Sequence, residues 1–124
     1  MPARQHRITR GDDYRRVSRA GRRVGGATCT THAVLHVGED SARFGFIISR
    51  AIGNAVTRNL VRRRMKTVVE RRLHEGFRGG DVVFRAHPAA AEASFSRLEA
   101  DMNRALDRVE RWRREAANGE REGR

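Results

Sequence analysis

The segment from Asn54 to Leu73 contains no glycine or proline and begins with a residue type that caps helices well. We therefore expect one long helix of about twenty residues here, with Asn54 as its N-cap. Strand-like segments flank it, at 44–49 before the helix and at 81–86 after it. A strand, a long helix and another strand favour a βαβ unit with the two strands parallel. General principles alone predict a right-handed crossover for such a unit.

The N-terminal half adds one helix and one more strand to this unit. A short helix is expected at 13–20, capped by Asp12 or Asp13 and stopped by the glycines that follow. Residues 28–37 alternate with the two-residue period of a strand. Because a Gly-Glu-Asp-Ser turn separates them from 44–49, these two strands are expected to form a β-hairpin.

The C-terminal part predicts a last helix from Ser94 or Ser96, since Ser96 and Glu99 have capping-box spacing. The element order is then α-β-β-α-β-α, an α/β (α+β) two-layer sandwich. We expect residues 1–124 to form a single domain with its ordered core at about 10–113. Residues 1–9 are interpreted as a flexible basic arm and 115–124 as a flexible tail.

Positive charge is concentrated in two short segments. The chain has 27 Lys and Arg against 15 Asp and Glu, a net charge of +12. Residues 1–25 contribute +6 and residues 53–72 another +6, so the remainder is balanced. Such focused charge is typical of a polyanion-binding surface. The sequence shows neither an apolar run of membrane-spanning length nor a secretory signal. We therefore expect a soluble cytoplasmic protein with no membrane partner.

The expected 54–73 helix has two distinct faces. At about 100° per residue, one sector collects five side chains that donate hydrogen bonds: Arg58, Asn59, Arg62, Arg63 and Lys66. The opposite arc is apolar and should face the core: Leu60, Val61, Met65 and Val68. Arg64 falls inside the apolar arc, so its aliphatic stem should extend along the helix and place the guanidinium group in solvent. A bound polyanion would relieve the repulsion among these cations.

Residues that could support catalysis by the protein itself are not grouped in the sequence. His32 and His36 are four residues apart on a strand, where that spacing does not form a metal site. The pair Asp12-Asp13 is interpreted as a helix cap. Cys29, the only cysteine, has no context that marks it as a nucleophile. We therefore expect no catalytic and no metal-binding residue on the protein.

One segment resembles a family signature. Residues 49–66 read Ser-Arg-Ala-Ile-Gly-Asn-Ala-Val-Thr-Arg-Asn-Leu-Val-Arg-Arg-Arg-Met-Lys. This is similar to the bacterial ribonuclease P protein subunit, whose signature is Gly-Asn-Ala-Val-x-Arg-Asn followed by basic residues at fixed spacing. Arg7 to Val17 resembles the N-terminal motif of the family, and Asp81 to Phe84 occupies the place of its third strand. The resemblance extends over about residues 7–110.

The resemblance implies a function and a fold. Family members bind a catalytic RNA and the 5′ leader of precursor tRNA, and assist the Mg²⁺-dependent endonucleolytic removal of that leader. The RNA performs the hydrolysis, so the partners would be ribonuclease P RNA and precursor tRNA, with Mg²⁺ held mainly by RNA. The family fold has a left-handed βαβ crossover, against the general expectation.

The resemblance also assigns site residues. Those facing the catalytic RNA would be Arg50, Asn54, Arg58, Asn59, Arg62, Arg63 and Lys66. The leader would pass through a cleft between the first helix and the sheet, at Tyr14, His36 and Ser49. Four positions depart from the family pattern: Ala51 replaces a basic residue, Ser18 replaces an aromatic one, His36 replaces a frequent Tyr, and Arg85 is displaced by one position from the usual basic residue at the strand end.

Two other classes of protein fit part of the pattern. A basic RNA-binding protein without a role in catalysis, such as a ribosomal protein or RNA chaperone, would carry the same charge and lack only the signature. A helix-turn-helix DNA-binding module needs two adjacent short helices, whereas strands flank the long basic helix here. No DNA partner is therefore expected.

Overall fold

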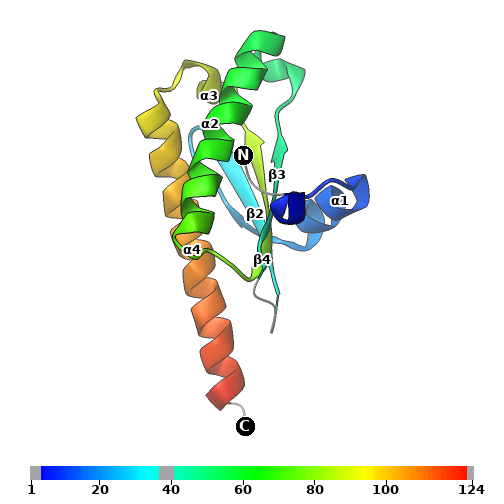
Figure 1. Cartoon of the computed structure of the whole chain (residues 1–124), viewed down its shortest axis with the longest axis vertical. Coiled ribbons are helices and arrows are strands. Elements are labelled where there is room, and N and C mark those ends of the chain that lie inside the picture. Colours follow the sequence, from blue (N-terminus) through cyan, green and yellow to red (C-terminus); the bar gives the residue numbers. More distant parts are fainter. Residues whose placement is uncertain (1–3, 37–40, 123–124) are drawn as a thin grey trace.

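A computed structural model describes residues 4–36 and 41–122. The turn expected at 38–41 lies largely outside these described residues. The elements follow in this order: a 3₁₀ turn at Arg4–His6, α1 at Gly11–Ala20, β1 at Arg22–Val24, β2 at Cys29–Leu35, β3 at Arg43–Ile47, a 3₁₀ turn at Arg50–Ile52, α2 at Ala55–His74, β4 at Gly80–Ala86, α3 at Ala89–Glu92 and α4 at Phe95–Glu122 (Figure 1).

The four strands form one mixed sheet in the order β1-β2-β4-β3. β4 pairs with β2 in antiparallel and with β3 in parallel orientation. The predicted parallel pairing across the long helix is therefore confirmed. The predicted β-hairpin of 28–37 with 44–49 is wrong, because β4 lies between β2 and β3. Strand β1, which pairs with β2 through Arg22–Val24, was not anticipated.

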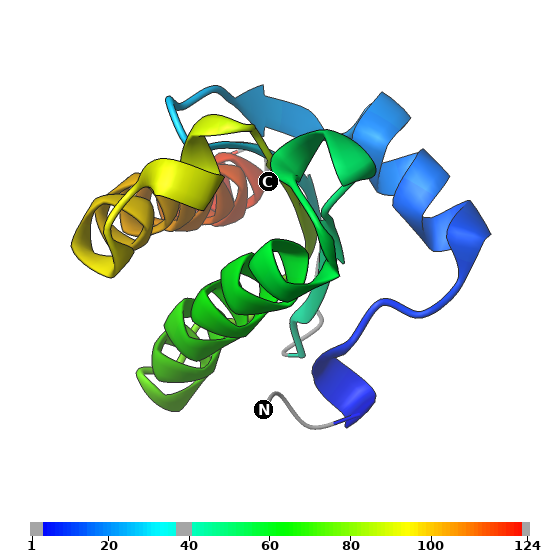
Figure 2. The same ribbon diagram turned by 90° about the horizontal axis from the view of Figure 1, so that it is seen from above.

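The crossover from β3 through α2 to β4 is left-handed. Seen from the side of α2 with both strands pointing up, β4 lies to the left of β3 (Figures 1 and 2). About 98% of such connections have the opposite hand. The general expectation is therefore wrong here, and the fold implied by the resemblance is correct.

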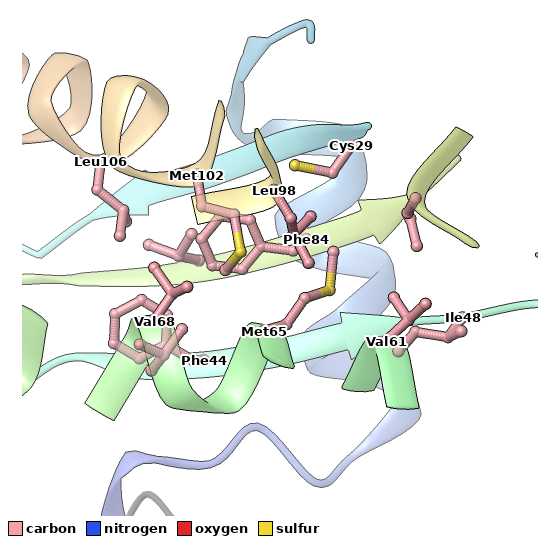
Figure 3. Close-up of a cluster of buried hydrophobic side chains, with 14 of the residues drawn as sticks. Cys29, Phe44, Ile48, Val61, Met65, Val68, Phe84, Leu98, Met102 and Leu106 are labelled. Atoms are coloured by element: carbon pink, nitrogen blue, oxygen red, sulfur yellow. The ribbon is translucent and has the colours of Figure 1, made fainter. Parts of the chain in front are cut away.

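Helices cover both faces of the sheet, with α2 and α4 on one side and α1 on the other (Figure 2). The main core lies between the sheet and the pair α2–α4 (Figure 3). Met65 from α2, Met102 from α4 and Phe84 from β4 are fully buried there. A smaller cluster under α1 contains Val17 and Val83.

The long helix α2 begins as predicted. The Oδ1 atom of Asn54 accepts a hydrogen bond from the Thr57 amide at 2.9 Å, which caps the helix. Gly53 immediately before it has φ of 150°, a conformation that side-chain-bearing residues rarely adopt. Arg64 does extend out of the apolar arc, and its Nη1 donates to the Ala93 carbonyl at 3.1 Å. That bond ties α2 to the end of α3.

One helix start differs from the sequence expectation, and another agrees with one of the two starts predicted for it. α1 begins at Gly11 with Arg10 in the N-cap position, and Asp12 and Asp13 lie within its first turn without capping it. In α4 the capping side chain is Ser94, whose Oγ accepts from the Arg97 amide at 3.1 Å. Ser94 is one of the two predicted starts of this helix, whereas the capping-box pair Ser96 and Glu99 lies inside it.

Parts of the two segments expected to be flexible have regular structure or buried contacts among the described residues. Ile8, inside the expected arm, is buried at 4% exposure, and its amide donates to the Phe44 carbonyl at 2.8 Å. α4 continues to Glu122, so most of the expected tail is helical. Among the described residues, no helix has the length and apolar character needed to cross a membrane.

Candidate nucleic-acid interface

The outer side of α2 carries an open depression about 420 Å³ in volume. The side chains that line it are Val56, Asn59, Arg62, Arg63 and Lys66. Four of these five are residues that the resemblance assigned to the catalytic RNA, and none of the five is acidic. Helical periodicity places them on the side of α2 that points away from the sheet (Figure 2). The depression is therefore a donor-rich surface open to a polyanion.

Asn59 and Arg62 are already oriented toward each other. The Nη1 atom of Arg62 donates to Asn59 Oδ1 at 3.2 Å. Since a guanidinium only donates, the amide atom that it meets is the oxygen. The NH₂ group of Asn59 is thus left as a donor beside the arginines.

Arg58 differs from the other members of the predicted set. It is half-buried and does not line the depression, and its Nε is buried without a hydrogen-bond partner in the structure. The remaining two members lie at the N-terminal end of α2. Asn54 acts as the helix cap, and Arg50 is exposed in the preceding 3₁₀ turn. The structure therefore brings four of the seven residues together in one depression, and the other three do not line it.

Tyr14 packs on the opposite face of the sheet, between α1 and β3. Its hydroxyl accepts a hydrogen bond from the Phe46 amide at 3.2 Å. A Cβ at position 45 would lie 2.6 Å from the tyrosine ring, so only glycine fits beneath it. Tyr14 is partly buried in this way and packs against the small cluster under α1.

A buried carboxylate holds α1 onto this face. Asp81 on β4 is fully buried and accepts hydrogen bonds from Arg16 of α1 and from Arg43 of β3, the latter at 2.7 and 2.9 Å. Burial by itself raises the pKa of Asp81, but the two arginines outweigh it and hold this pKa below its ordinary value. Asp81 is therefore ionised and fixes the angle of α1.

The three residues assigned to the leader cleft are not brought to one point. Tyr14 lies over the middle of the sheet, above Gly45. The His36 amide donates to the Gly79 carbonyl at the start of β4, and its Nε2 lies 3.3 Å from Asp81. Ser49 follows the far end of β3. By strand spacing, His36 and Ser49 are on the order of 20 Å apart.

A different histidine lies level with Tyr14. Gly45 on β3 is in register with Val83 on β4, which is in register with His32 on β2. His32 in turn pairs with Arg23 on β1. Burial lowers the pKa of His32, and the nearby Arg85 and Arg23 lower it further. His32 itself is buried at 9% exposure, and the exposed Arg23 and Arg85 make the surface beside it positive.

The two-residue alternation of β2 predicts that His32 and His36 lie on the same face of the sheet, so the sequence could have indicated the face of His32. The sequence does not give the register between β2 and β4. That register pairs His32 with Val83 in the middle of β4 and leaves His36 beyond the end of the paired segment. Arg23 and Arg85 flank this face and are both exposed.

The described residues show no grouping of three or more His, Cys, Asp or Glu side chains that could hold a metal ion. Burial raises the pKa of Cys29 to about 11, so its thiol stays protonated at neutral pH. These surfaces present cations and a tyrosine ring, which are groups suited to contacts with anions and with bases.

Comparisons with known proteins identify the family to which this chain is similar. A family model described as Ribonuclease P matches residues 1–110. The ribonuclease P protein component of Clavibacter michiganensis subsp. michiganensis is 42% identical over 111 residues, covering 90% of this chain and 98% of the relative. That of a Nocardioides species is 40% identical over 106 residues, covering 84% of this chain and 91% of the relative.

Solved structures agree in fold. The RNase P protein of Staphylococcus aureus superposes with a TM-score of 0.74 at 21% identity, covering 84% of this chain and 94% of that one. The RNase P protein from Thermotoga maritima gives 0.73 at 20% identity, covering 82% and 96%. At this identity the likeness establishes the shared fold. With the family model and the close relatives, it places this chain in the ribonuclease P protein component family.

Proposed function

We propose that this protein carries out the family role through two separate surfaces. The outer face of α2 binds the ribonuclease P RNA, and the α1 side of the sheet binds the 5′ leader of precursor tRNA. The observation that carries the first assignment is the acid-free depression lined by Asn59, Arg62, Arg63 and Lys66. Closely spaced cations without acidic partners repel one another, and a phosphate backbone relieves that repulsion.

The leader surface extends from the partly buried Tyr14 to the exposed Arg23 and Arg85, which lie beside the buried His32. A single-stranded leader binds through base stacking on aromatic rings and through cations that follow its backbone. Tyr14 supplies a ring, and Arg23 and Arg85 supply cations on the same side of the sheet. Because α2 lies on the other side of the sheet, one protein can hold both RNA molecules at once (Figure 2).

Hydrolysis of the phosphodiester bond belongs, in this proposal, to the RNA. The described part of the protein brings no three His, Cys, Asp or Glu side chains together around a metal-sized site, and the buried Asp81 near the leader surface is engaged by arginines. The protein residues therefore bind and orient RNA in the cytoplasm, while RNA phosphates hold the Mg²⁺ that the complete enzyme needs.

Reconstitution tests this proposal. Purified protein and bacterial ribonuclease P RNA are combined with a precursor tRNA at low Mg²⁺. We expect cleavage at the mature 5′ end with both components present and little with either alone. Binding of the RNA without any gain in cleavage would contradict the proposal and favour a general RNA-binding role, as would recovery of ribosomal RNA alone from a lysate.

A further inference from the structure

Val56 is an unusual residue within the donor-rich depression. It is 78% exposed, and among the described residues it is the only large apolar side chain classed as exposed. It lies on the first turn of α2, three residues before Asn59, and lines the same depression as the arginines. Single exposed apolar residues need no explanation in general. This one is set among groups that attract RNA phosphates.

Phosphates alone give Val56 no favourable contact. A regular RNA duplex offers a protein helix its phosphates and riboses, and its narrow major groove hides the bases. An unpaired base is different, because its apolar face is open and gains from being covered. The side chains of residues three apart on a helix lie about 5–6 Å from each other. Val56 and Asn59 are therefore spaced to contact the face and the edge of one base.

Asn59 is prepared for the edge contact. Its oxygen already accepts from Arg62 at 3.2 Å, which turns the NH₂ group outward. That group can donate to a ring nitrogen or carbonyl oxygen of a base. The flanking Arg63 and Lys66 can hold the phosphates on either side of the same nucleotide.

We propose that Val56 and Asn59 receive an unpaired nucleobase of the ribonuclease P RNA, with Val56 packing on its face and Asn59 donating to its edge. This inference rests on the proposed function and adds what kind of RNA feature α2 recognises. It predicts that the helix contacts a bulge, loop or junction, where a base is free to leave the stack, and not a continuous duplex.

Val56→Thr tests the apolar contact, because threonine keeps the shape of valine and replaces a methyl group by a hydroxyl. Binding of the full chain to ribonuclease P RNA is measured over a series of KCl concentrations. We expect Val56→Thr to weaken binding about three- to tenfold at every salt concentration. The slope of log Kd against log salt should stay that of the wild type, because no phosphate contact is lost.

Val56→Ile is the matched control, since it keeps an apolar β-branched side chain at the same place. It should bind at least as well as the wild type. Chemical probing of the RNA should also show an unpaired nucleotide that the wild type and Val56→Ile protect and Val56→Thr does not. Because Val56 is exposed, all three proteins should have the same melting temperature.

Two results would overturn the inference: wild-type affinity for Val56→Thr, or a loss accompanied by a smaller salt slope, which would assign the effect to phosphates. Either result for the variant is compatible with a wild-type protein that activates the RNA, so neither would refute the proposed function. Failure of the wild type to bind or activate the RNA would instead refute the proposed function itself.

Discussion

At the scale of single residues, Gly45 determines how Tyr14 is presented. The ring lies against the β3 backbone where any Cβ would be 2.6 Å away, and the hydroxyl is held by the Phe46 amide. A tyrosine fixed at both its face and its tip loses little freedom when a base stacks on it. The small residue is thus as important to the leader surface as the aromatic one.

Gly45→Ala should displace the Tyr14 ring and break its hydrogen bond to Phe46. We expect a loss of about 1–3 kcal/mol in the free energy of unfolding, measured by urea denaturation, and weaker binding of precursor tRNA by the reconstituted enzyme. Affinity for the ribonuclease P RNA should not change, since α2 is on the other side of the sheet. Gly25→Ala is the control, because no atom lies within 4 Å of its Cβ position. Equal stability of the two variants would contradict this account.

Sequence reasoning was most accurate for residues whose environment is local. The cap at Asn54 and the outward path of Arg64 follow from positions a few residues away along one helix. His32 shows the limit of that reasoning. Its place under α1 depends on pairing with Val83, which is about fifty residues further along the chain. No local pattern distinguishes it from His36.

At the scale of the element, the two sides of α2 have different roles. One side buries Val61, Met65 and Val68 in the core, and the other presents the donors of the depression. The helix is also joined to α4 by Arg72, whose guanidinium donates to Asp107 at 2.7 Å and Glu110 at 2.9 Å. The binding face therefore rests on a helix that is fixed along its length.

Removing single cations from this face should change the salt dependence of RNA binding. Arg62→Ala and Arg63→Ala should each weaken binding to the ribonuclease P RNA and lower the slope of log Kd against log salt by about one unit. Arg111→Ala, at an exposed position on α4, is the matched control and should leave the slope unchanged. If the α2 variants and the control behave alike, the outer face of α2 is not the RNA surface.

The elements themselves were largely predictable, and their arrangement only in part. Hydrophobic periodicity and a helix cap located α2, β2, β3 and β4, because these signals lie within each segment. The hairpin failed because a turn signal between two strands says nothing about a third strand that inserts between them. Only the family resemblance predicted the left-handed crossover, because the general preference is for a right-handed one.

At the scale of the whole molecule, two buried carboxylates join distant parts of the chain. Asp81 connects α1, β3 and β4, while Asp101 of α4 accepts from the Thr28 amide and hydroxyl at 3.1 and 2.6 Å. Burial raises the pKa of Asp101, but the bonds from Thr28 prevail and this pKa is also below its ordinary value. Both groups are more acidic folded than unfolded.

Acid should therefore destabilise the protein. A carboxylate with a depressed folded pKa contributes its full stability above the unfolded value of about 4 and loses it as the pH falls through the folded value. Urea denaturation between pH 7 and pH 2.5 should show this decline. Asp81→Asn should be less stable at pH 7 and lose less stability on acidification. An unchanged pH profile for Asp81→Asn would contradict the role given to Asp81.

The central position of β4 has a consequence for synthesis on the ribosome. β2 can pair with β1 as soon as both have emerged, but β3 has no neighbouring strand in the sheet until β4 is made. The basic helix α2 is translated in that interval, before the sheet surface on which it packs is complete. Completion of the sheet thus waits for the last strand to be synthesised, and a nascent chain that ends before Gly80 carries its most basic helix without the core beneath it.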